Sequence, residues 1–390
     1  MATAAISSSS SSSQHNRPPA IPWYLWCVAL AVTSVTIGAH WDVSWHRSIG
    51  RDTFWTPAHM AIYLCGVLAG ICCGYLILNT TFRRPPELVA SSVGVFGFRG
   101  PLGAFLAAWG GIAMLTSAPF DNWWHDAYGL DVKIVSPPHT LLIFGIFAVE
   151  IGAFFLIAAA MNRAEHAQSA KLQWLLLYLG GLMLVLGMFF RMEYTWDIRL
   201  HSAGAYISVA LGVPTYFAMF WECSRNRWAG TWTACIYMLF LIGLILILPL
   251  FPAEPKLGPV YQPVHQFIPP KFPLLLIVPA FAMDLLLQKT ETWKLWLRSL
   301  IAGPLFLLTL VAVEWPFASF LMTDAAKNGF FGAAYLGYRE PPESADALRE
   351  FFRPEHGLIL WQGLAMAMLY SALSVLIGLA LGRWMRKIQR

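Results

Sequence analysis

The sequence predicts an all-α, polytopic membrane protein with about ten transmembrane helices. Of its 390 residues, 57% are hydrophobic and only 12% are charged, whereas soluble domains carry about 25% charged residues. Apolar runs of about 20 residues, the length that crosses a bilayer, recur along the whole chain. The net charge of +5 comes from basic residues at the ends of these runs. We therefore expect the lipid bilayer, and no nucleic acid, as a partner.

The order of the runs predicts repeated helix hairpins. Residues 1–20 are serine-rich and predict a disordered cytoplasmic tail. An even number of crossings would place both termini on the same side of the membrane. The predicted spans are 21–39, 58–78, 100–117, 138–161, 172–190, 203–221, 231–251, 272–287, 300–321 and 358–381.

Charge in the short loops predicts the orientation. Basic residues concentrate on the side that carries both termini, for example Arg83, Arg84, Arg383 and Arg386. By the positive-inside rule, we expect both termini in the cytoplasm. The membrane would be the inner membrane of the cell. The acid-rich loops then face outward, including the long loop at 322–357.

The first outer loop carries a predicted metal site. Asp42 and His46 are four residues apart and share one helical face. His59 follows 13 residues after His46, beyond a glycine turn and a new helix start at Thr56-Pro57. Side chains from the end of one helix and the start of the next can therefore meet at one ion. Carboxylate and imidazole ligands suit copper, zinc or iron.

The same pattern returns about 80 residues later with Asp121, His125 and His139. Both copies read D-x2-W-H-x3-G-x-D, followed by Ser or Thr, Pro, one residue and His. The Ser or Thr is a natural helix N-cap, and proline is favoured at the first helical position. The agreement indicates an internal repeat. Both copies would lie at the outer face, related by an axis along the membrane normal.

Five further residues near these patterns are candidates for supporting roles. Asp52 and Asp131 follow the turn glycines by two positions, where a carboxylate can orient a ligating imidazole or simply shape the turn. His40 precedes the first motif as a spare ligand or as a partner of one. Asp197 and His201 form a weaker third D-x3-H pattern.

Three acids fall inside apolar runs, namely Glu150, Asp284 and Glu314. Ionisable groups are expensive to place in a membrane and suggest a function there. The interpretations are a proton relay, with Glu150 as its first candidate, paired structural carboxylates, or helix boundaries that differ from the predicted ones.

The first motif, W-H-x4-R-D-T-x2-T-P-x-H from Trp45 to His59, closely resembles the C subunit of the copper membrane monooxygenases. This family includes particulate methane and ammonia monooxygenases. There the motif supplies one aspartate and two histidines to copper near the outer membrane face. The resemblance covers residues 21–161, a metal-binding repeat domain of four helices. Family C subunits are shorter, so the six further helices of 162–390 lie outside it.

The second motif also resembles the family, with one departure. The family has an asparagine and two histidines at this spacing, and His125 and His139 match the histidines. Asp121 stands in place of the asparagine and adds a negative charge.

The resemblance implies a copper-dependent monooxygenase, or a subunit of one, that oxidises a small membrane-soluble substrate with O2. One or two copper sites, additional membrane subunits and an external electron donor would be involved. The sequence has no haem-attachment motif and no nucleotide fingerprint. A metal transporter or chaperone and a non-catalytic subunit with a structural metal are the alternatives. Transport predicts that the intramembrane acids line a path, whereas catalysis predicts a closed metal chamber.

Overall fold

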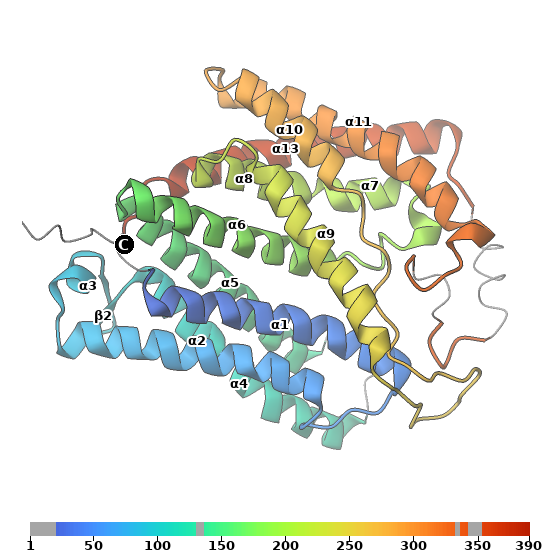
Figure 1. Cartoon of the computed structure of the whole chain (residues 1–390), viewed down its shortest axis with the longest axis horizontal. Coiled ribbons are helices and arrows are strands. Elements are labelled where there is room, and N and C mark those ends of the chain that lie inside the picture. The colour runs from blue at the N-terminus through green and yellow to red at the C-terminus, as the bar shows by residue number, and fades with distance from the viewer. Residues whose placement is uncertain (1–20, 130–135, 332–335, 342–352) are drawn as a thin grey trace, which may run out of the picture.

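The computed structural model describes residues 21–129, 136–331, 336–341 and 353–390, and it is almost entirely helical (Figure 1). Nine helical segments within these ranges are long and apolar enough to cross a membrane. The predicted all-α polytopic fold is thus confirmed. The predicted tail at 1–20 lies outside the described residues, and the loop at 322–357 lies only partly within them.

Helices α1, α2, α4 and α5 form one group, and α7, α8, α10, α11 and α13 form another, with α6 and α9 between the two (Figure 1). Helix α1 begins and α13 ends at the same end of the molecule. The elements of the first half are α1 (Trp23–Ser48), α2 (Pro57–Phe82), α3 (Pro86–Ala90), β1 (Val93–Val95), β2 (Phe98–Gly100), α4 (Leu102–Tyr128), α5 (Pro137–Arg163) and α6 (His166–Phe189). Those of the second half are η1 (Asp197–Arg199), α7 (Ala203–Ala210), α8 (Val213–Ser224), α9 (Ala229–Ile247), η2 (Leu248–Leu250), α10 (Ile277–Lys289), α11 (Leu295–Leu321), η3 (Asp324–Ala326) and α13 (Gly357–Met385).

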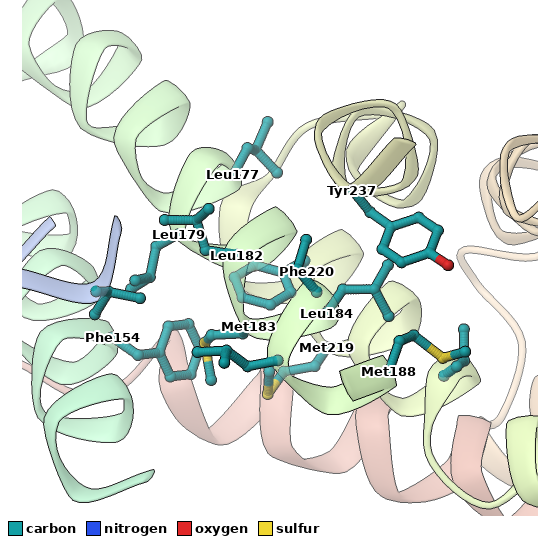
Figure 2. Close-up of a cluster of buried hydrophobic side chains, with 14 of the residues drawn as sticks. Phe154, Leu177, Leu179, Leu182, Met183, Leu184, Met188, Met219, Phe220 and Tyr237 are labelled. Atoms are coloured by element: carbon teal, nitrogen blue, oxygen red, sulfur yellow. The ribbon is translucent and has the colours of Figure 1, made fainter. Parts of the chain in front are cut away.

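The core is centred on α6. Figure 2 shows Leu182 and Met183 of this helix among side chains from its neighbours, including Phe154 of α5, Phe220 of α8 and Tyr237 of α9. All five are buried. Helix α6 therefore joins the motif-bearing half to the second half through one continuous apolar core.

Close glycine contacts hold the helices of the first half together. A Cβ atom added to Gly110 of α4 would lie 2.6 Å from the carbonyl oxygen of Gly145 in α5. One added to Gly111 would lie 2.6 Å from the carbonyl oxygen of Gly66 in α2. Small residues allow transmembrane backbones to approach in this way. Helix α4 therefore packs directly against the backbones of both neighbours.

The predicted span at 272–287 is a broken segment. Only α10 is helical, and about 13 residues rise about 20 Å, too short to cross alone. Pro269, Pro270 and Pro273 precede it and cannot donate helical hydrogen bonds. Side chains of neighbouring helices accept hydrogen bonds from the backbone of the extended part. Tyr237 Oη accepts from Leu274 N at 3.2 Å, and Glu314 accepts from Leu275 N at 2.9 Å. Irregular backbone inside a membrane needs such partners.

Two other segments differ from the predicted elements. The run at 203–221 is divided into α7 and α8 at Leu211-Gly212, because Pro214 cannot continue the hydrogen bonding of one helix. Between α2 and α4, β1 and β2 form a short antiparallel hairpin that the sequence did not predict. Its turn residues Phe96 and Gly97 both have positive φ, as two-residue hairpin turns require.

Candidate metal centre

The first motif lies where α1 ends and α2 begins. The helix of α1 extends beyond the predicted apolar run to Ser48, so Asp42 and His46 occupy its last two turns. Gly50 then turns the chain with a φ of 87°, and α2 starts with Pro57 after the N-cap residue Thr56. His59 lies in the first turn of α2.

These three side chains meet in space. Asp42 Oδ1 lies 3.2 Å from His59 Nε2, and Asp42 Oδ2 lies 3.8 Å from His46 Nε2. The carboxylate of Asp42 thus stands between two imidazoles that come from different helices. The predicted spacing therefore brings the three residues together.

A second carboxylate joins this first cluster. Asp52 Oδ2 lies 3.5 Å from His59 Nε2 and 3.6 Å from His46 Nε2. The sequence assigned Asp52 only a supporting or turn role, but its side chain is slightly closer to His46 than that of Asp42 and only 0.3 Å farther from His59. The first cluster therefore contains two carboxylates and two imidazoles, namely Asp42, His46, Asp52 and His59.

The loop between these helices is fixed by its own residues and by the second half of the chain. Trp45 Nε1 donates to the carbonyl of Arg51 at 2.8 Å across the glycine turn. Ser44 Oγ donates to the carbonyl of Ile268 at 2.6 Å, and Lys256 N donates to the carbonyl of Ile49 at 2.9 Å. The end of α1 is therefore held by segments more than 200 residues away in sequence.

The second motif has a matching arrangement at the end of α4 and the start of α5. Asp121 Oδ2 lies 3.2 Å from His125 Nε2, and Asp121 Oδ1 lies 3.5 Å from His139 Nε2. Gly129 ends α4 with a φ of 91°. Ser136 is the N-cap of α5, and its hydroxyl accepts from His139 N at 3.3 Å. The second cluster consists of Asp121, His125 and His139; Asp131 lies outside the described residues.

Both clusters have a buried carboxylate oxygen that could bind a cation. Asp42 Oδ1 and Asp121 Oδ1 are buried, and within the described residues neither accepts a well-aligned hydrogen bond, although an imidazole Nε2 lies 3.2 Å and 3.5 Å away, respectively. An unsatisfied buried carboxylate oxygen is costly unless a cation or donor reaches it. Tetrahedral ligands about 2.1 Å from an ion are about 3.4 Å apart, which is close to the acid–imidazole distances here.

In both clusters the side chains are nevertheless arranged as acid–imidazole pairs and not around one common point. Among the described residues, no three His, Cys, Asp or Glu side chains are already set as ligands of one ion. Binding would therefore require side-chain rotation within each cluster. The clusters are also not enclosed, since the side chain of His46 is 36% exposed and that of His139 is 28% exposed. The predicted closed chamber is absent from the part of the chain that the structure describes.

Tyr63 of α2 lies near acidic residues of both clusters. It lies one helical turn after His59, and the two ring centroids are 6.0 Å apart. The carboxylates of Asp42, Asp52 and Asp121 all lie within electrostatic range of its hydroxyl. The two clusters are therefore near neighbours at one end of the helix bundle.

His40 points away from the first cluster. Its Nδ1 lies 2.9 Å from the carbonyl oxygen of Thr36, and its ring packs against Phe189 and Phe240. It lines a cavity of about 280 Å³ on the opposite face of α1, together with Val43, Ser44 and residues of α6 and α9. The suggestion that His40 is a spare ligand gains no support from this position.

The third D-x3-H pattern does not form a cluster. Asp197 pairs with Lys271 at 3.6 Å, whereas His201 Nε2 lies 2.8 Å from Ser319 Oγ and its ring packs on Trp315. Burial lowers the pKa of His201. These contacts fit structural roles for both residues.

The intramembrane acids have separate environments. Asp284 accepts from Gly230 N, Thr231 N and Thr231 Oγ1, and Glu314 accepts from Leu275 N. Both carboxylates thus accept hydrogen bonds from backbone N–H groups, Asp284 at the start of α9 and Glu314 in the extended segment before α10. Glu150 is 1% exposed, and its Oε1 has no hydrogen-bond partner among the residues that the structure describes.

Comparison of the chain with protein-family models, with curated proteins and with solved structures gives no match.

Proposed function

We propose that this multi-pass membrane protein binds copper at its Asp–His–His clusters and acts as a subunit of a copper-dependent monooxygenase. The first cluster is the principal site, and the second is a related site. Both motifs would lie at the outer face of the inner membrane, with both termini in the cytoplasm. The resemblance of the first motif to the copper membrane monooxygenases supplies the choice of metal.

One observation carries the proposal. In both clusters, Oδ2 of the aspartate faces the histidine four residues later and Oδ1 faces the histidine of the next helix. Each cluster also has a positive-φ glycine between the two helices. The same atoms in the same roles support an internal repeat. They favour two copies of a binding site over two unrelated histidine clusters.

Bound copper would supply the ability to activate O2, and the residues of the chain would hold and orient it. Asp42, His46 and His59 would bind the metal in the first cluster, and Asp121, His125 and His139 would bind it in the second. Asp52 would bind directly or accept a hydrogen bond from an imidazole, which orients a ligating ring. The second carboxylate also adds negative charge that attracts a cation.

The open face of the clusters supports a role as one subunit of a larger assembly. Trp55 is 73% exposed, Trp123 55% and Tyr128 64%, and all three lie in or beside the two motifs. Exposed aromatic side chains of this kind suit a membrane interface or a protein partner. A companion subunit would exclude water from the metal and leave a small apolar substrate to arrive through the bilayer.

A metal transporter is less well supported. That alternative needs the intramembrane acids to line a path, but Asp284 and Glu314 are engaged with backbone N–H groups of α9 and of the segment before α10.

The test is metal analysis of the purified protein beside the variant His46→Ala/His59→Ala. The control is His265→Ala, which removes an exposed histidine outside both clusters. We expect copper in the wild type and the control, and a marked loss in the double variant. Loss of zinc or iron instead would reject the monooxygenase while leaving the site. Full copper retention would reject the site itself.

A further inference from the structure

A cluster of arginines lies at the end of the bundle opposite the metal motifs, where α8 and α13 end and α11 begins. Three guanidinium groups share the carboxylate of Glu222. Its Oε1 lies 2.8 Å from Arg298 Nη1 and 3.4 Å from Arg383 Nε, and its Oε2 lies 3.7 Å from Arg386 Nη1.

Glu222 and Arg298 form a buried ion pair. The side chains of Arg298 and Glu222 are 1% and 4% exposed. The guanidinium of Arg298 also lies 4.9 Å from the ring of Trp221, and its Nη2 lies 3.5 Å from the carbonyl of Leu287. Arg298 alone therefore supplies the buried Glu222 with an opposite charge at hydrogen-bond distance.

The other two arginines therefore introduce surplus positive charge. Arg383 and Arg386 have side chains 44% and 40% exposed, so both reach the surface of the molecule. Glu291, the other acid that acts on Arg298, compensates for part of this charge. Three arginines facing two acids still leave an unbalanced cation, and like charges this close repel one another unless an anion joins them.

The packing of the helices fixes this arrangement. A Cβ atom on Gly382 of α13 would lie 2.6 Å from the carbonyl oxygen of Met219 in α8, so the two backbones are in contact here. Asn162 of α5 donates to the carbonyls of Met385 and Ile388, both at 2.8 Å, which ties down the chain after α13. The arginines are therefore held in place and do not lie on a free tail.

The depth of the cluster indicates the kind of anion. Trp384, between the two exposed arginines, is 50% exposed, and exposed tryptophans are typical of the headgroup level of a bilayer. Guanidinium groups pair strongly with phosphate, and basic pockets between transmembrane helices bind anionic lipid headgroups. We infer that Arg383 and Arg386, supported by Arg298 and Glu222, bind the phosphate of an anionic phospholipid.

The experiment titrates the detergent-solubilised full chain with short-chain phosphatidylglycerol and follows its melting temperature. Parallel titrations use phosphatidylcholine and inorganic phosphate. The variants are Arg386→Gln and Arg383→Gln/Arg386→Gln. The control is Arg227→Gln, which removes an exposed positive charge near the same end without touching Glu222. Arg298 is left intact because its loss would strand a buried carboxylate.

We expect phosphatidylglycerol to raise the melting temperature of the wild type and the control at equal concentrations. The apparent affinity should fall about fivefold in the single variant and about 25-fold in the double variant. An equal effect of phosphatidylcholine, or unchanged affinity in the variants, would overturn the inference. An equal effect of inorganic phosphate would overturn the lipid as the source of the anion. If the double variant does not fold, the phosphatidylglycerol affinity of Arg386→Gln alone tests the inference.

Discussion

The two Asp–His–His clusters have the same internal arrangement but different surroundings. The first is held by the second half of the chain, through Ser44 and Ile49, and includes a second carboxylate from Asp52. The hydrogen bonds described for the second are local, such as that from His139 N to Ser136. The comparison separates what the structure describes in both clusters, which is an acid between two imidazoles, from what it describes in the first alone, which is a loop held by distant segments and the carboxylate of Asp52. The corresponding residue of the second motif, Asp131, lies outside the described residues.

The largest difference should come from the turn glycines. Gly50 and Gly129 both have positive φ, and Gly129 with a ψ of 172° lies in a region almost restricted to glycine, so the backbone strain of alanine costs about 1–3 kcal/mol at each position. A Cβ on Gly50 would also collide with the hydroxyl of Tyr338, whereas one on Gly129 meets no atom of the described residues within 4 Å. We expect Gly50→Ala to lower the melting temperature clearly more than Gly129→Ala. Equal losses would mean that Tyr338 does not hold the first loop.

Helix contacts near each cluster should give a smaller and more selective effect. A Cβ on Gly38 would lie 2.8 Å from Ile62 Cγ1, between α1 and α2, and one on Gly145 would lie 2.7 Å from Met114 Cγ, between α4 and α5. Overpacking costs about 1–3 kcal/mol. Gly38→Ala should weaken copper binding by the first cluster, and Gly145→Ala should weaken that by the second.

The control for both is Gly74→Ala in α2, because a Cβ there meets no atom within 4 Å in the described part of the chain. Thermal unfolding and copper content measured on the same samples would separate general destabilisation from a selective loss. A uniform loss of copper from both clusters in each variant would contradict the comparison.

Asp52 adds a second carboxylate to the first cluster. Asp52→Asn removes one negative charge beside His46 and His59 while keeping the shape of the side chain. We expect copper affinity of the first cluster to fall about tenfold, and Asp42→Asn to have a larger effect. Competition with a copper chelator measures both. Asp126→Asn, a nearby exposed acid of α4 outside the clusters, should leave affinity unchanged.

The helix starts should show the smallest difference. Ser136 caps α5, so Ser136→Ala should cost about 1 kcal/mol. Thr56 Oγ1 instead accepts from Thr53 N within the loop and makes no cap hydrogen bond to α2. Thr56→Ala should therefore loosen the first loop and leave the start of α2 intact. Hydrogen exchange of the amides of His59 and His139 tests this, and faster exchange at His59 in Thr56→Ala would contradict it.

Much of this molecule could be predicted from local patterns. Apolar length predicted the membrane helices, and the four-residue spacing of Asp42 and His46 predicted their common helical face. The position of His59 after Thr56-Pro57 predicted that this residue lies in the first turn of the next helix, which the structure bears out. These features depend on residues close in sequence, so a single sequence is enough to find them.

The features that were missed depend on distant partners. The approach of Asp52 to both histidines depends on the path of a loop that Lys256 and Tyr338 contact, and no local rule predicts that path. The break before α10 did have a signal in Pro269, Pro270 and Pro273, but the apolar run after them predicted a complete span. The role of Glu314 as an acceptor for Leu275 N becomes visible only once that break is known.

The most direct test of the copper proposal is electron paramagnetic resonance of the Cu(II)-loaded protein labelled with ¹⁵N-histidine. The account predicts coupling of copper to imidazole nitrogens in the wild type and in His265→Ala. That coupling should diminish in His46→Ala/His59→Ala and disappear when His125→Ala/His139→Ala is added. Copper without histidine coupling, or a spectrum unchanged in the four-histidine variant, would contradict the assignment of both clusters.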